Sequence, residues 1–97
     1  MGLLDRFTTK HRFDDGATLS GLHRYALRYD QGARRVEIGF EQALEPGVDR
    51  IVHVNSIVSW TTPDGDVPLT REEKHLILAR VLEYCRVKHL RYRVVEY

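Results

Sequence analysis

The stretch TREEKHLILARVLEYCRV, residues 70–87, decides the fold because it predicts one long amphipathic helix. Thr70 and Glu73 have the S/T-x-x-E spacing of a capping box, in which each side chain satisfies a free backbone amide of the first helical turn. The apolar side chains recur at the spacing of one helix face, and they are Ile77, Leu78, Val81, Leu82 and Cys85. We therefore expect a helix over 71–87 that packs this face against a sheet.

Segments before and after the helix predict the sheet. Apolar and charged residues alternate over 25–29 and over 36–40, and turn-forming residues at 30–33 connect the two into a β-hairpin. A further apolar segment, 51–60, predicts a strand that is either bent or interrupted, and the β-prone tail 91–97 rejoins the sheet. The order β-β-β-(β)-α-β indicates an α+β fold: a small, mostly antiparallel sheet with one main helix packed on one face, and room for one parallel pair of strands.

The other segments are expected to be irregular. We expect a single α+β domain over 1–97, in which 1–21 is an irregular N-terminal segment with a short helical turn near its start. Strands are expected only after Gly21. The sequence TPDGD at 62–66 has the Pro, Asp and Gly typical of turns, so we expect a turn that leads toward the helix.

The composition is that of an ordinary globular protein, with 42% hydrophobic and 30% charged residues and a net charge of +1. No apolar run approaches the ~20 residues that cross a bilayer, and the N-terminus lacks the apolar core of a signal peptide. The single cysteine, Cys85, excludes a disulfide within the chain and favours a reducing compartment. These features predict a cytoplasmic protein without membrane association.

Charge is distributed unevenly along the chain. Residues 37–73 carry eight acidic and two basic side chains, whereas residues 74–97 carry six basic and two acidic ones. Each block can attract a partner of opposite charge, unless folding interleaves the blocks so that their fields average out. The carboxylates of the acidic block that are candidates for binding a protein partner are Glu41, Glu45, Asp49, Asp64 and Asp66.

Two further features offer alternatives. The basic C-terminal block is interleaved with tyrosines, and such a mixture can pair with phosphates and stack on bases. Its candidate nucleic-acid-binding residues are Arg86, Lys88, Arg91 and Arg93. Trp60 either packs in the core under the helix or stands partly exposed as a candidate anchor for a protein partner, because tryptophan is frequent at interface hot spots.

No motif in the sequence points to catalysis or to metal binding. The five histidines are not spaced as metal ligands, and no pattern matches a nucleophile elbow or a phosphate-binding loop. Cys85 falls on the apolar face of the predicted helix, where a thiol packs as a small hydrophobic group. We therefore expect no catalytic residues, no metal and no cofactor, although an active site assembled in space from distant residues stays an open alternative.

Several short motifs stand in the last half of the chain: SIVSW at 56–60, Pro63, LTREE at 69–73, and the helix that contains Ile77 and Val81. Together they resemble small bacterial immunity proteins of polymorphic-toxin systems, over about residues 50–97. The resemblance implies a cytosolic α+β protein that binds and blocks a toxin domain through complementary charge, with the acidic block facing a basic toxin such as a nuclease. One departure is at Lys88 and His89, where the resemblance implies a glycine, so one of these residues must take the left-handed conformation that ends the helix.

The sequence thus predicts a non-catalytic module with a protein partner, most concretely an immunity-type toxin inhibitor. Two alternatives stay open: a nucleic-acid-binding protein that uses the basic C-terminal block, and a small enzyme with a spatially assembled site. A homodimer through an exposed sheet edge is compatible with all three.

Overall fold

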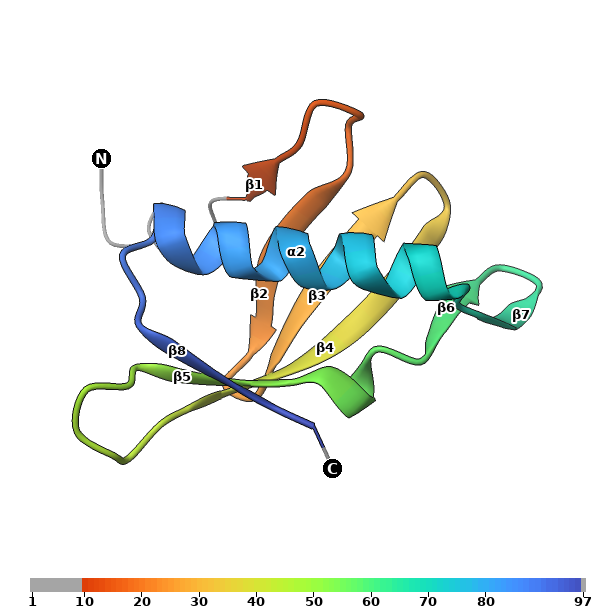
Figure 1. Ribbon diagram of the computed structural model, residues 1–97. Coiled ribbons are helices and arrows are strands. Elements are labelled where there is room, and N and C mark those ends of the chain that lie inside the picture. Colours follow the sequence, from red (N-terminus) through yellow and green to blue (C-terminus); the bar gives the residue numbers. More distant parts are fainter. Residues whose placement is uncertain (1–9, 97) are drawn as a thin grey trace.

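The computed structural model describes residues 10–96 and shows a twisted sheet crossed on one face by a long helix (Figure 1). The helix α2 spans Arg71–Val87, and a short 3-10 helix, η1, spans Val54–Ser56. The strands are β1 (His11–Arg12), β2 (Thr18–His23), β3 (Ala26–Gln31), β4 (Arg34–Gln42), β5 (Arg50–His53), β6 (Ser59–Thr62), β7 (Gly65–Pro68) and β8 (Tyr92–Val95). They follow the order β1-β2-β3-β4-β5-β8, and the β6–β7 hairpin joins the sheet through β4.

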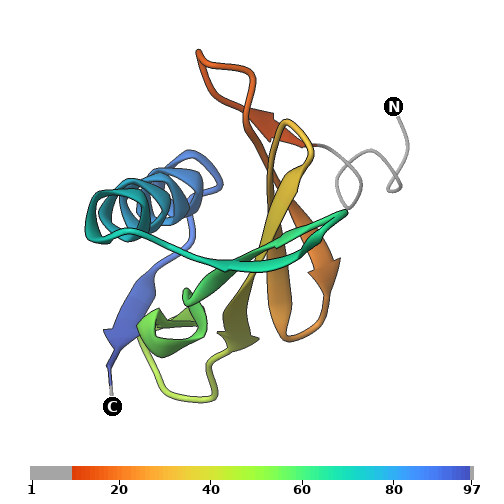
Figure 2. The ribbon, with the colours of Figure 1, turned by 90° about the vertical axis from the view of Figure 1, so that its right-hand side faces the viewer.

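This arrangement confirms the α+β class and the position of the helix. Neighbouring strands are antiparallel except for β5 and β8, which are parallel because the chain passes through α2 between them. The view from the side shows α2 lying against one face of the sheet (Figure 2). The predicted return of the C-terminal tail to the sheet is therefore correct.

The β3–β4 hairpin has the predicted two-faced character. Leu27 lies opposite Ile38 and Tyr29 lies opposite Val36, and all four side chains are buried. The residues between them point to the other face of the sheet, as the two-residue period of a strand requires. Tyr25 departs from the prediction, because it lies in the β2–β3 turn and is 57% exposed instead of facing the core.

The helix begins and ends as its sequence dictates. The Thr70 hydroxyl accepts a hydrogen bond from the Glu73 amide at 3.1 Å, and the Glu73 carboxylate accepts one from the Thr70 amide at 2.8 Å, which completes the capping box. At the other end His89 adopts φ 58°. The amide of Leu90 donates to the carbonyl of Cys85 at 2.8 Å, so the helix ends in a Schellman motif with histidine in the place usually taken by glycine.

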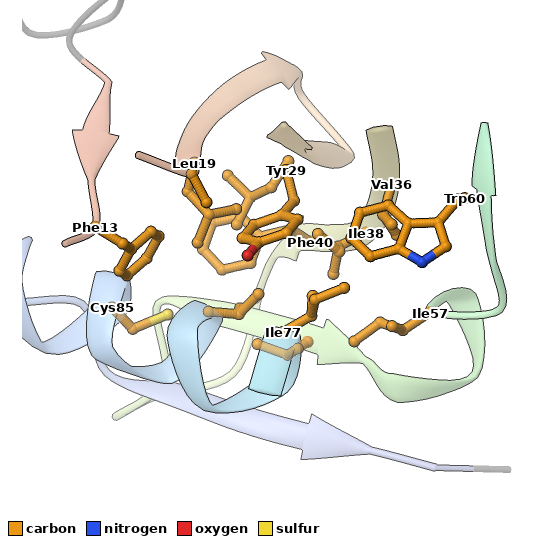
Figure 3. Close-up of a cluster of buried hydrophobic side chains, with 14 residues drawn as sticks. Phe13, Leu19, Tyr29, Val36, Ile38, Phe40, Ile57, Trp60, Ile77 and Cys85 are labelled. Atoms are coloured by element: carbon orange, nitrogen blue, oxygen red, sulfur yellow. The ribbon is translucent and has the colours of Figure 1, made fainter. Parts of the chain in front are cut away.

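The core lies between α2 and the sheet (Figure 3). The helix contributes Ile77, Val81 and Cys85, all fully or almost fully buried. Trp60 is only 1% exposed and lies near Tyr29, with 6.1 Å between the ring centroids. Of the two interpretations of the tryptophan, core packing is therefore the correct one.

The N-terminal region is more regular than the sequence suggests. Within the expected irregular segment 1–21, the structure has β1 and most of β2, and Leu19 of β2 is completely buried. Arg80 of α2 holds the connecting loop: its guanidinium pairs with Asp15 at 2.9 Å and donates to the Tyr29 hydroxyl at 2.6 Å. The helical turn expected near the start of the chain lies outside the described residues.

The region between β5 and α2 agrees with the prediction except for one strand. The segment 51–60 is interrupted, since β5 ends at His53 and η1 separates it from β6. The expected turn at 62–66 is the tip of the β6–β7 hairpin, in which Thr62 pairs with Gly65. Strand β7 escaped the sequence analysis because all its residues are exposed, so it has no alternation of apolar and polar positions.

Candidate functional site

The candidate acidic residues do not form one surface. Glu45 and Asp49 lie in the loop between β4 and β5, whereas Asp64 and Asp66 lie in the β6–β7 hairpin. Figure 1 places these two regions at opposite ends of the molecule, and Figure 2 keeps them apart. Glu41 is separate again, on β4, where its carboxylate contacts the His53 ring at 2.8 Å.

Folding brings the acidic and basic blocks together at the end of the sheet where β8 begins. The Glu45 carboxylate pairs with Arg93 at 2.6 Å. Asp49 accepts three hydrogen bonds from Arg91: from the backbone amide at 2.7 Å, from Nε at 3.1 Å and from Nη2 at 3.1 Å. These bonds stabilise the ionised carboxylate and lower the pKa of Asp49 to about 2. The two charge blocks thus neutralise each other here and attach β8 to the loop before β5.

The hairpin carboxylates differ, because they remain uncompensated. Asp64 and Asp66 are exposed and form no ion pair with any other residue in 10–96. Of the candidate acidic residues, Asp64 and Asp66 are the two whose carboxylates have neither a cationic nor an imidazole partner among the described residues.

The environment of Trp60 is a small polar cluster at the start of α2. Its indole Nε1 donates to the Glu73 carboxylate at 3.1 Å, and the Arg34 guanidinium carbon lies 4.1 Å from the centre of the Trp60 ring. Arg34 also pairs with Glu73 at 3.4 Å. The amide hydrogen bond from Thr70 and the hydrogen bond from the indole lower the pKa of Glu73. This ring is enclosed on all sides by its own chain, so it is not available as an exposed anchor.

The basic C-terminal block is divided in the same way as the acidic block. Arg91 and Arg93 pair with carboxylates, as described above. Arg86 and Lys88, at the end of α2, form no ion pair with a described residue, and the Lys88 ammonium lies 5.8 Å from the centre of the Tyr84 ring. The continuous basic track that a nucleic-acid backbone would follow is therefore interrupted.

The groups that could support chemistry are dispersed. Among residues 10–96, no three His, Cys, Asp or Glu side chains gather as a metal site would require. Burial raises the pKa of the Cys85 thiol to about 11, which keeps it protonated and unreactive at neutral pH. In the part of the chain that the structure describes, no helix combines the length and the apolar character needed to span a bilayer.

A hollow of about 660 Å³ opens between the β2–β3 turn and the C-terminal end of α2. We call it the basic hollow, because four of its lining side chains are basic or imidazole groups and none of the lining residues carries a carboxylate. It is lined by Gly21, Leu22, His23, Arg24, Ala26, Leu27, Phe40, Arg50, Tyr84, Lys88 and Leu90. Except for Lys88, its residues were not candidates in the sequence analysis.

The sequence held one signal for this hollow. The β2–β3 turn consists of Arg24 and Tyr25, where tight turns usually carry Gly, Asn, Asp or Pro, and it follows the exposed Leu22 and His23 at the end of β2. Large apolar and basic side chains in an exposed turn indicate a binding role more than a conformational one. The signal was hidden because Arg24 and Tyr25 continue the alternating pattern of the following strand.

Comparison with known proteins assigns the chain to a family. The family model of Immunity protein 74 matches residues 21–95, a range that contains the end of β2, every later element and all the residues that line the basic hollow. No curated protein and no solved structure matches the chain. The resemblance suggested by the motifs of the last half is therefore confirmed over a longer range, and the chain belongs to the Immunity protein 74 family.

Proposed function

We propose that this protein is an immunity protein that binds a toxin domain and blocks it by direct, non-catalytic contact. The observation that carries the proposal is the family match over residues 21–95, which spans most of the chain. The proposal places the protein in the cytoplasm of a bacterium, where it would meet the toxin before the toxin reaches its target, and it requires no cofactor.

The fold supports such a role because it presents a preformed surface. An interface of standard size buries about 800 Å² on each partner, which is about an eighth of the 6666 Å² of accessible surface on this chain. One end of the molecule is enough to supply that area without rearrangement of the core.

The test is co-expression with a toxin-like domain, which the proposal expects to be encoded beside the gene. We expect growth of a bacterial host to stop when that domain is induced alone and to recover when this protein is produced with it. We also expect the two chains to elute together as a one-to-one complex in size-exclusion chromatography.

A matched control separates binding from unspecific effects of expression. Ile77→Asp places a charge in the fully buried core and should abolish both folding and protection. Persistent toxicity in the presence of the folded wild-type protein, with no complex formed, would contradict the proposal. The homodimer through a sheet edge stays a separate prediction, and the outer edge of β8 is the position at which to test it.

A further inference from the structure

The basic hollow has the charge of a receptor for an anionic group. Arg24 and Lys88 stand on two sides of it, in the β2–β3 turn and at the end of α2, and neither forms an ion pair with a described carboxylate. Arg50 adds a third charge, and its own hydrogen bond goes to the backbone carbonyl of Asp49 at 2.9 Å instead of to a carboxylate. Arg24 and Lys88 thus face this depression without a described carboxylate partner, and Arg50, whose charge also acts on the Asp49 carboxylate, stands beside them.

Aromatic rings line the same hollow. Phe40 and Tyr84 meet edge to face with 6.2 Å between their ring centroids. The Arg50 guanidinium carbon lies 5.9 Å from the centre of the Phe40 ring, and the Lys88 ammonium lies at a similar distance from Tyr84, so each cation rests near an aromatic surface. Burial raises the pKa of the Tyr84 phenol, which therefore stays protonated and able to donate a hydrogen bond at neutral pH.

We propose that the basic hollow is the docking site for an acidic loop of the toxin, which would place Asp or Glu side chains against Arg24, Arg50 and Lys88 and an apolar side chain against Phe40 and Tyr84. This inference rests on the proposed function and gives it a surface and a partner chemistry. It assigns the contact to the opposite charge from the one that the sequence suggested. Guanidinium groups beside aromatic rings are the groups that most often dominate protein interfaces.

A protein loop fits the hollow better than a nucleic acid does. Of the four candidate nucleic-acid-binding residues, Arg91 and Arg93 are already paired with Asp49 and Glu45, and only Arg86 and Lys88 have no ion pair among the described residues, so the free cations form no long row. A nucleic-acid backbone carries one phosphate after another and gains affinity from such rows. A single loop needs only one local pocket, with apolar walls such as Leu22 and Leu90.

The experiment measures the dissociation constant of the complex between the toxin domain encoded beside the gene and three forms of this protein. The test form carries Arg24→Glu and Lys88→Glu, which reverse two charges of the hollow. The control form carries Arg71→Glu and Arg86→Glu, which change the net charge by the same amount at exposed positions outside the hollow. We expect the test form to bind at least roughly 100-fold more weakly, because like charges would face each other across the interface, and the control form to stay within about threefold of wild type.

Every other outcome bears on the docking site, on the proposed function, or on both. If the Arg24→Glu and Lys88→Glu form binds the toxin domain as tightly as wild type and its melting temperature is unchanged, the docking site is overturned and the proposed function is left intact. Absence of wild-type binding to the toxin overturns both. Loss of binding on Asp64→Lys and Asp66→Lys instead would assign the contact to the acidic hairpin. Binding of a single-stranded oligonucleotide that depends on Arg24 and Lys88, without toxin binding, would assign the hollow to nucleic acid.

Discussion

Replacement of Glu73 by alanine should test how the start of α2 is connected to the core. The Glu73 carboxylate accepts hydrogen bonds from the Thr70 amide at 2.8 Å and from the Trp60 indole at 3.1 Å, and it pairs with Arg34 at 3.4 Å. One side chain therefore caps the helix and satisfies the polar atom of a tryptophan that is 1% exposed. Alanine at this position removes all three interactions and provides no substitute.

The expected loss of stability follows from these contacts. A buried indole N–H without an acceptor costs about 1–3 kcal/mol, and loss of the carboxylate from the first turn adds about 0.5–1 kcal/mol. The exposed ion pair with Arg34 contributes little. The sum of about 1.5–4 kcal/mol corresponds to a decrease in melting temperature of at least about 6 °C for a domain of this size. Thr70→Ala, which leaves the indole bonded, should cost only about 1 kcal/mol.

The assay is urea unfolding followed by fluorescence and by circular dichroism. Trp60 is the only tryptophan in the chain, so its emission reports this cluster alone. Glu73→Gln is the matched control: its single acceptor oxygen can bond either the Thr70 amide or the Trp60 indole but not both, because these donate to different oxygens of Glu73, so it should cost about 1 kcal/mol, less than alanine. A Glu73→Ala protein within about 0.5 kcal/mol of wild type would refute the reasoning, as would equal losses in the alanine and glutamine forms.

The stability that the Glu73 carboxylate contributes should decrease as the pH falls. Hydrogen bonds in the folded state lower the pKa of Glu73 below its ordinary value. The stabilisation is therefore fully present above the unfolded-state pKa and is lost as the pH falls through the lower folded-state pKa. Glu73→Gln should remove this part of the acid sensitivity, measured as the difference between the melting temperatures of the two proteins along a pH series.

Three further predictions concern other parts of the fold. His89→Gly should raise the free energy of unfolding by about 1 kcal/mol, because glycine adopts the observed φ of 58° without the steric cost of a Cβ atom. A melting temperature that is unchanged or lower would contradict this. Arg91 lowers the pKa of Asp49 to about 2, so the wild-type protein should lose stability as the pH falls from about 4 to about 2. Asp49→Asn should abolish this loss in thermal melts at acid pH, and an unchanged acid profile would argue against the reasoning. The Cys85 thiol, with its pKa of about 11, should resist alkylation at neutral pH until denaturant is added, and rapid labelling of the native protein would show that the helix face is open.

The sequence was sufficient to predict the elements whose residues show a helix or strand periodicity within the element itself. The helix Arg71–Val87 agrees with the prediction at both ends, because the capping box and the apolar face are encoded within the helix itself. The β3–β4 hairpin is equally local, since alternation and turn residues adjoin each other in the chain. The absence of a nearby glycine also predicted a left-handed residue at Lys88 or His89, and the structure places it at His89.

Elements without an apolar period could not be found in this way. Strand β7 is exposed throughout, and β1 is only two residues long. Strand β2 carries one large buried side chain, Leu19, between small polar residues, so its burial depends on contacts made far away in the chain. The loop before β2 is likewise held by a distant partner, through the pair of Arg80 with Asp15, which no pattern over a short window can reveal.

The sequence by itself determined the α+β class, the boundaries of the helix and the family motifs of the last half, because these depend on neighbouring residues. Only the tertiary structure decided which charges stay free. It paired Asp49 with Arg91 and Glu45 with Arg93, residues more than forty positions apart, and so neutralised two of the eight acidic side chains of 37–73 with two of the six basic ones of 74–97. It also brought the β2–β3 turn to the end of α2 and created the basic hollow. The physical reason is that electrostatic fields depend on distance in space, whereas the sequence shows only distance along the chain.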